Sequence, residues 1–145
     1  MIDSPEIIKI LIDAGVDIDT RDMDGYTTLM KTKSLEVAQL LIDAGADVNA
    51  TLPYAITVLM ITDSPEILRL LVAAGADINA QNIMGETALM RTCSLQKIKT
   101  LIDLGADPRI KDNFGGDAFT IFRECDDQEE IKRYLEDLKA LYPAT

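Results

Sequence analysis

The chain has 145 residues, of which 48% are apolar and 27% charged, and this suits one soluble globular domain with its own core. Its 25 acidic and 14 basic side chains give a formal net charge of −11, which argues against nucleic acid as a partner because phosphates attract Lys and Arg. No apolar run approaches the roughly 20 residues that cross a bilayer, and the N-terminal residues lack the basic and apolar regions of a secretion signal. We therefore expect a cytoplasmic protein with no membrane association.

The first predicted element is a helix that begins after Ser4 and ends at Gly15. Ser4 can cap the helix start, Pro5 suits the first helical position, and Glu6 suits the positive end of the helix dipole. Apolar residues then recur at helical spacing over residues 7–14. In the repeating unit described next, this helix is the second half. The chain therefore opens halfway through a unit, either because a longer protein was truncated or because this helix is an atypical cap.

Three sequence markers return at a constant step of 30 residues along the chain. They are the glycines at 15, 45, 75 and 105, the Thr-x-Leu-Met stretches that start at 27, 57 and 87, and the serines at 4, 34, 64 and 94. Each unit is predicted to contain an extended arm, a tight turn, a short first helix of about two turns and a second helix that ends at the glycine. One such unit cannot bury its apolar side alone, so neighbouring units must stack.

The C-terminal part departs from this pattern. Residues 114–122 are predicted to replace the usual turn and first helix, and a final helix is predicted over residues 128–142. That helix lacks the Gly-Ala-Asp ending, has one apolar face and one charged face, and is followed by Pro143. We interpret it as a cap that covers the last apolar surface.

The repeating pattern Asp-x-x-Gly-x-Thr-x-Leu, followed by Leu-Leu-Ile-x-x-Gly-Ala-Asp-Val-Asn-Ala, resembles the ankyrin repeat. In one unit the matching residues are Gly25, Thr27, Leu29, Leu40, Leu41, Gly45, Ala46, Asp47, Val48 and Asn49, and in another they are Gly85, Thr87, Leu89, Gly105, Ala106 and Asp107. The unit is shorter than the usual 33 residues or so of the family, and methionines 30, 60 and 90 stand where the family has a hydrogen-bonding histidine.

The resemblance implies an all-α, ankyrin-like helix-turn-helix solenoid with short extended turn arms. We expect one domain over residues 1–145, made of a half repeat at 1–17, repeats at 18–47, 48–77 and 78–107, and a capping repeat at 108–145.

The sequence offers little for catalysis, so we expect no enzyme, no cofactor and no metal. It has no histidine, no Gly-rich phosphate loop and no Cys-x-x-Cys motif. Asp22 and Asp24 are interpreted as turn residues whose side chains bond to the local backbone. Cys93 and Cys125 are interpreted as lone thiols.

Binding is better supported, because apolar residues occupy turn positions that are usually polar. The predicted turn-tip contacts are Met23, Tyr26, Leu52, Tyr54, Ile56, Ile83, Met84 and Phe114, and the predicted concave-face contacts are Lys31, Ile61 and Arg91. Tyr54 is expected to be the strongest single contact. Alternatively, Leu52 and Ile56 fold back and pack internally. The acidic run over residues 124–130 is either a second binding surface or a solvated helix start.

We therefore predict a protein-binding module. Its acidity favours a basic protein partner, since opposite fields speed encounter, or it merely keeps the protein soluble. One specific hypothesis is an acidic inhibitor of a basic enzyme, such as an immunity protein for a toxin. The alternatives are a targeting or scaffold fragment of a larger effector-like protein, or a self-associating structural repeat. We expect a monomer or weak self-association.

Overall fold

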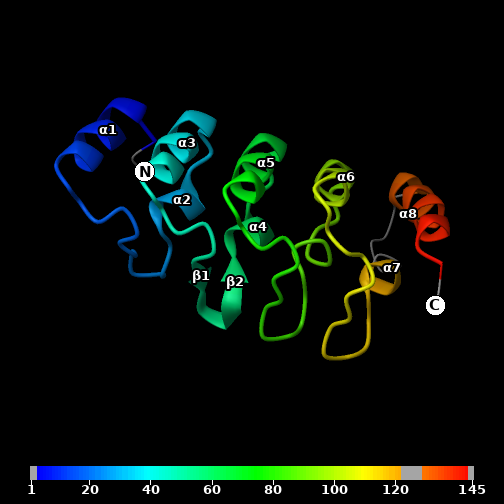
Figure 1. The fold of residues 1–145 in the computed structure, drawn as a ribbon. Coiled ribbons are helices and arrows are strands. Elements are labelled where there is room, and N and C mark those ends of the chain that lie inside the picture. Colours follow the sequence, from blue (N-terminus) through cyan, green and yellow to red (C-terminus); the bar gives the residue numbers. More distant parts are fainter. Residues whose placement is uncertain (1–2, 122–128, 144–145) are drawn as a thin grey trace. The chain divides into compact units, whose positions relative to one another are not determined.

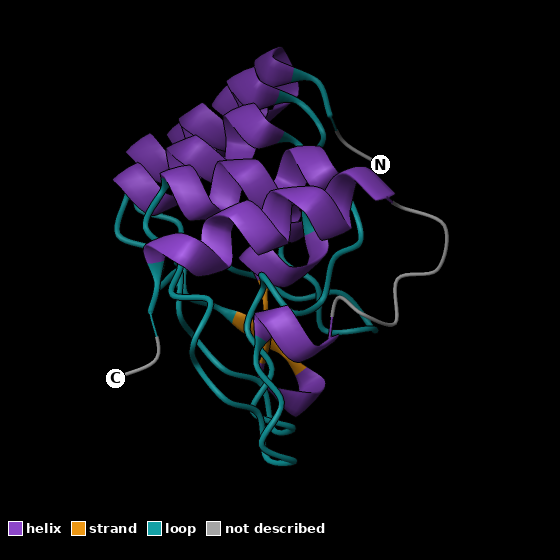
Figure 2. Ribbon diagram, turned by 90° about the vertical axis from the view of Figure 1, so that its right-hand side faces the viewer, coloured by secondary structure: helices purple, strands orange, loops and turns teal. Residues whose placement is uncertain are grey.

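The computed structural model describes residues 3–121 and 129–143, and its secondary structure is mostly α-helical (Figure 1). The chain divides into two compact units, an N-terminal unit of residues 1–77 and a C-terminal unit of residues 78–145. The division falls at the predicted boundary between two repeats. Within each unit the long helices lie on one side and the turns project away from them (Figure 1). Figure 2 draws the same helices in purple and the turns in teal.

The N-terminal unit repeats one arrangement of a short helix followed by a long one. Its long helices lie side by side in the order α1, α3, α5 (Figure 1). A two-residue antiparallel ribbon interrupts the turn before α4, with Thr51 opposite Thr57 and Leu52 opposite Ile56. In chain order the elements are α1 (Pro5–Asp13), α2 (Thr28–Lys31), α3 (Leu35–Asp43), β1 (Thr51–Leu52), the 3-10 turn η1 (Pro53–Ala55), β2 (Ile56–Thr57), α4 (Val58–Ile61) and α5 (Pro65–Ala73).

The C-terminal unit contains three helices among its described residues. They are α6 (Leu95–Asp103), the one-turn helix α7 (Ala118–Ile121) and α8 (Glu129–Leu141). The stretch 88–91, which aligns with α2 and α4, is a turn and not an α-helix. None of the helices in the described part of the chain has the length and apolar character to cross a bilayer.

The predicted helix signals operate as expected in three of the four long helices that they mark. The hydroxyls of Ser34, Ser64 and Ser94 accept hydrogen bonds from backbone N–H groups in the first turns of α3, α5 and α6, at 3.3, 3.3 and 3.4 Å. Ser4 is the exception, because its hydroxyl donates to the Glu6 carboxylate at 2.6 Å and makes no cap bond. Each of these helices ends two residues before its glycine, and Gly45 at φ 92° shows the left-handed conformation that terminates α3.

Each unit has its own apolar core, built from the inner faces of the helices. In the N-terminal unit the fully buried side chains include Val37, Leu41, Leu59, Ile67, Leu68 and Leu71, and in the C-terminal unit they include Leu89, Ile98, Leu101 and Ile131. The three methionines at the family's histidine position are also buried. Their flexible apolar side chains fill space in the two cores.

Besides the Ser4 cap, three sequence predictions are wrong. The short first helices have four residues, about one turn, and not two turns, because Thr32 and Thr62 adopt extended backbone angles that end α2 and α4. The C-terminal turn and first helix are not replaced, since Asp112 N–H bonds to Gly116 O at 2.8 Å, as in the other turns, and α7 follows. Cys93 is not a lone thiol but is disulfide-bonded, while Cys125 lies outside the described residues.

Candidate functional site

Three of the turns are closed by the same side-chain bonds. Oδ1 of Asp22 accepts from the backbone N–H groups of Asp24 and Tyr26, at 3.0 and 2.9 Å. In the equivalent positions Asn82 and Asp112 make the same pair of bonds to the residues two and four places ahead, at 2.8 to 2.9 Å. The backbone polar groups of the turn are thereby satisfied locally, and the side chains at the tip are free to point outward.

The second turn is built differently, because Leu52 occupies the position of these polar residues. The ribbon of β1 and β2 replaces the side-chain bonds. Tyr54 at φ 65° and Ala55 at φ 59° both adopt the left-handed region, which costs roughly 1 kcal/mol or more per residue for side chains other than glycine. Tyr54 lies at the exposed end of this turn.

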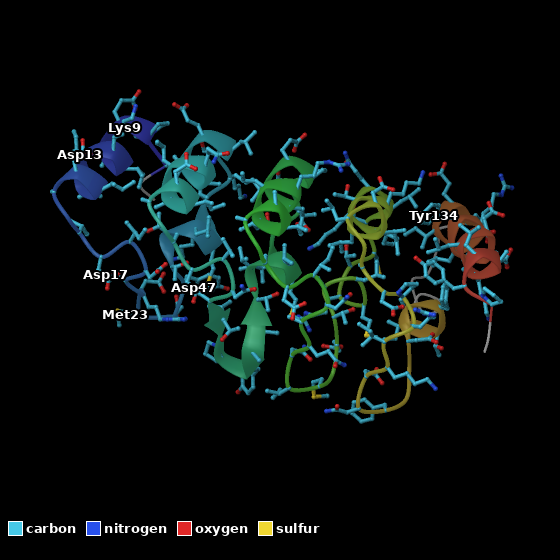
Figure 3. The ribbon with its side chains drawn as sticks, in the orientation of Figure 1. Lys9, Asp13, Asp17, Met23, Asp47 and Tyr134 are labelled. Atoms are coloured by element: carbon cyan, nitrogen blue, oxygen red, sulfur yellow. The ribbon has the colours of Figure 1, made fainter. Side chains whose placement is uncertain are left out.

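In the N-terminal unit, two of the predicted turn-tip residues are strongly exposed. Met23 is fully exposed at the end of its loop (Figure 3), and 71% of Tyr54 is accessible. The side chains of Leu52 and Ile56 are half-buried. Leu52 and Pro53 lie against the first turn. A Cβ atom added at Gly25 would lie 3.5 Å from Pro53 Cδ. The first two turns therefore pack together, which agrees with the alternative of internal packing for Leu52.

In the C-terminal unit, the predicted tip residues Ile83, Met84 and Phe114 are all exposed, and 79% of the Phe114 side chain is accessible. Their turns are tied together through Asn113, whose backbone N–H bonds to Met84 O and whose amide bonds to Ile83 O, both at 2.9 Å. Each unit thus presents apolar side chains on a pair of turns that contact each other.

The predicted concave-face cations are paired with carboxylates of their own repeat. Lys31 donates to Asp22, and its Nζ lies 5.3 Å from the centre of the Tyr26 ring, which is itself half-buried. This hydrogen bond lowers the pKa of Asp22 and raises the pKa of Lys31. Arg91 Nη1 lies 2.8 Å from Glu86 Oε2.

Lys31 and Ile61 line the same hollow of about 300 Å³ in the N-terminal unit. Lys33, Asp63 and Met30 belong to its lining as well. The structure thus brings these two predicted residues together, whereas Arg91 belongs to the C-terminal unit.

A hollow that the sequence reasoning missed lies beside the last turn. It has a volume of about 460 Å³ and is lined by Glu86, Asp112, Phe114, Gly115, Gly116, Thr120 and Ile121. An alignment of the repeats could have pointed to this hollow, because Asp112 aligns with Asp22 while Ile121 aligns with Lys31.

The described acidic side chains do not gather into a metal site. No group of three His, Cys, Asp or Glu residues suited to a metal ion is found within residues 3–121 and 129–143. Of the acidic run at 124–130, Glu129 and Glu130 are exposed at the start of α8, and residues 124–128 lie outside the described residues. The surfaces that remain are apolar turn tips and shallow hollows, which suit contact with another molecule.

A family model of ankyrin repeats, in three copies, matches residues 31–112, more than half of the chain. No curated protein matches the sequence. The match agrees with the Thr-x-Leu-Met and Gly-Ala-Asp markers and with the helix order of both units. The chain belongs to the ankyrin-repeat family.

Proposed function

We propose that this chain is a protein-binding module that contacts its partner through the turn tips. Ankyrin repeats are generally protein–protein interaction modules and are typically not enzymes. The observation that carries the proposal is the exposure of large apolar side chains on the turns, namely Met23, Tyr54, Ile83, Met84 and Phe114. Exposed aromatic and Met side chains on a rigid support are typical of interface centres.

The turn bonds explain how such a surface would bind. Because the carboxylate or amide of Asp22, Asn82 and Asp112 fixes each turn, little conformational entropy is left to lose on association. In the second turn the pairing of β1 with β2 has the same effect. Preorganisation therefore supports affinity from a modest contact area.

We further propose that the repeats form one solenoid domain, with the half repeat 1–17, repeats 18–47, 48–77 and 78–107, and the cap 108–145. The family match supports this proposal because it covers residues 31–112 and so continues across residue 77, where the two units divide. Denaturant unfolding tests this proposal. One transition that coincides for probes in both units is expected, and two separate transitions would contradict a single domain.

The partner that fits best is a basic protein, because the net charge is −11. An acidic inhibitor that covers a basic enzyme, as an immunity protein does, is the most specific form of this proposal. It predicts association kinetics that slow steeply with added salt.

Affinity capture from lysate of the source cells tests the turn-tip proposal, with wild type, Tyr54→Ala and Met23→Ala in parallel. The matched control is Leu141→Ala, which removes an exposed apolar side chain from α8. A partner that is retained by the control and reduced at least severalfold by either turn variant supports the proposal. A partner that binds all four proteins equally excludes the turn tips, and the absence of any partner contradicts protein binding itself.

Self-association is a second candidate because α1 carries two exposed isoleucines. Ile7 is 46% and Ile10 66% exposed, whereas Val37 and Ile67, which align with Ile7, are 0% and 1% exposed. In Figure 3, Lys9 and Asp13 project outward from the same helix. Sedimentation at increasing concentration should show a weak dimer that Ile10→Lys abolishes. A concentration-independent monomer would remove this candidate.

A further inference from the structure

The N-terminal unit contains a complete lysine site formed within the chain. Asp22 uses Oδ1 to close its turn and leaves Oδ2 for the Lys31 ammonium group. The Tyr26 ring lies beside the same ammonium, with 5.3 Å between Nζ and the ring centre. A carboxylate and an aromatic ring together hold a lysine more strongly than either does alone. This cluster shows how a turn of this kind holds the lysine of its own repeat.

The last repeat has the same carboxylate but lacks the lysine. Asp112 lies 90 residues after Asp22, and its Oδ1 closes the turn in the same way, accepting from Phe114 and Gly116 N–H. Ile121 stands where Lys31 would be. Within the described part of the chain, no side chain or backbone group donates to Oδ2 of Asp112. Among the described residues, the turn therefore presents a carboxylate oxygen without the cation that its equivalent holds.

The missing side chains leave a hollow in front of this oxygen. Gly116 stands where Tyr26 is, so two long side chains of the first site are replaced by shorter ones. The resulting space of about 460 Å³ has Asp112 and Glu86 on its walls, with Phe114 and Ile121 as apolar lining. Glu86 Oε2 is already engaged by Arg91 and Asn82, which leaves Asp112 as the principal negative group.

We propose that this hollow, the Asp112 hollow, binds the side chain of a lysine presented by a basic partner protein. The proposal rests on the protein-binding function proposed above and names the chemistry of one contact. The ammonium group would bond to Oδ2 of Asp112, as Lys31 bonds to Oδ2 of Asp22. The alkyl stem would lie against Phe114 and Ile121. The net charge of −11 favours the approach of such a partner.

A small probe tests the site without knowledge of the partner. We would titrate the ¹⁵N-labelled chain with Nα-acetyl-lysine methylamide and follow the backbone amides by NMR. The neutral control is Nα-acetyl-norleucine methylamide, which has a similar stem and no charge. A single exposed ion pair predicts weak binding, with a dissociation constant of roughly 10 mM. Saturable shifts are expected at Phe114, Gly115 and Gly116 with the lysine probe only.

Three substitutions make the test specific. Asp112→Asn keeps the turn acceptor, as Asn82 shows in the preceding repeat, but removes the charge, so lysine affinity should fall about tenfold. Ile121→Lys supplies an internal ammonium and should abolish probe binding. Lys31→Ile vacates the equivalent site and should create new lysine-dependent shifts around Asp22.

The possible outcomes separate this inference from the general function. Shifts that are equal for the lysine and norleucine probes, or unaffected by Asp112→Asn and Ile121→Lys, would overturn the lysine site. Tighter binding of the matching arginine probe would also overturn the assignment to lysine. If a captured partner still depends on Tyr54 in either case, the protein-binding function stands while the site assignment fails. If the probe binds as expected but no partner is captured, the site stands and the function proposed above fails.

Discussion

Thr27 and Thr87 occupy the same position in two repeats but differ in their hydrogen bonding. Thr27 Oγ1 accepts from Met30 N–H at 3.4 Å, whereas Thr87 is 2% exposed and its Oγ1 has no partner among the described residues. A buried hydroxyl without a partner destabilises the folded state. Thr87→Val should therefore raise the free energy of unfolding by about 1 kcal/mol, as measured by urea denaturation.

Thr27→Val is the matched control for this prediction. It removes a helix-capping acceptor and should lower the free energy of unfolding by about 1 kcal/mol. If both substitutions lower the free energy of unfolding, the Thr87 hydroxyl does have a hydrogen-bond partner in solution.

Asp19 differs from its equivalents in later repeats by its carboxylate. Asn49 accepts from Asp77 N–H at 2.8 Å and donates to Gly75 O at 3.1 Å, so its amide bonds twice to the end of the same repeat. Asp19 only accepts, from Asp47 N–H at 3.1 and 3.2 Å, because a carboxylate has no N–H. Asp19→Asn should stabilise the protein by roughly 0.5–1 kcal/mol through the added bond.

The reciprocal variant Asn49→Asp tests the same reasoning in the opposite direction. It loses the bond to Gly75 O and should lower the unfolding temperature. If Asp19→Asn is neutral while Asn49→Asp destabilises, the bond to the following glycine does not form at the first position.

At the scale of the element, the turn η1 between β1 and β2 carries backbone strain that glycine would relieve. Ala55 at φ 59° aligns with Gly25 and Gly85, which have φ values of 87° and 80°. Ala55→Gly should stabilise the fold by about 0.5–1 kcal/mol because glycine adopts the left-handed conformation without steric strain. Part of this gain is offset because glycine gives the unfolded chain more conformational entropy. Chemical denaturation measures this change directly.

Gly85→Ala is the opposing control, since its Cβ atom would lie 2.7 Å from Asn113 N. That distance requires backbone movement, so this variant should be clearly destabilised. A destabilised Ala55→Gly would mean that the left-handed backbone at residue 55 is not a source of strain.

The long helices were predictable because their signals are local. A serine, an acidic residue in the first turn and a glycine at the end mark α3 and α5 without reference to the rest of the chain. The short helices were overestimated because a helix of one turn is stabilised by packing and not by its own propensity. Residues 88–91 align with α2 and α4 but form only a turn, although Ala88 and Leu89 are buried.

At the scale of the whole molecule, the candidate surface was predictable in part. Turn position alone predicted the exposure of Met23 and Phe114, since the tip of a turn has no neighbour to cover it. Leu52 is half-buried because it lies against Gly25 of the preceding turn, a contact between residues far apart in sequence. The Asp112 hollow likewise depends on how two turns pack. The alignment of the repeats shows only that Ile121 stands in the position of a lysine.

The acidity of the whole chain sets up two opposing effects of pH on stability. Four carboxyl groups among the described residues have lowered pKa values. A hydrogen bond from the Ser4 hydroxyl lowers the pKa of Glu6, and hydrogen bonds from its own backbone N–H and then from Ser64 lower the pKa of Glu66. Hydrogen bonds from Lys31 and Arg109 lower the pKa values of Asp22 and Asp107. A carboxyl group with a lowered pKa binds its proton more weakly in the folded state. The stability that such a group contributes is fully present when the pH is above its ordinary pKa, 4.5 for Glu and 3.8 for Asp. This stability is lost as the pH falls through the lowered pKa of the folded state. Against this, protonation of other carboxylates relieves the repulsion that comes from a net charge of −11.

We predict that the specific bonds outweigh the general repulsion, because they act at short range. The unfolding temperature should change little between pH 7 and 5 and fall below about pH 4.5. Asp22→Asn keeps the turn acceptor, as Asn82 does, but cannot titrate, so its decline should be shallower than that of wild type. Because the Asp22–Lys31 pair is exposed, added salt should reduce the difference between the two proteins. An unfolding temperature that rises steadily as the pH falls through 3.8 would show that relief of repulsion dominates, and that the lowered pKa values contribute less than the excess of negative charge.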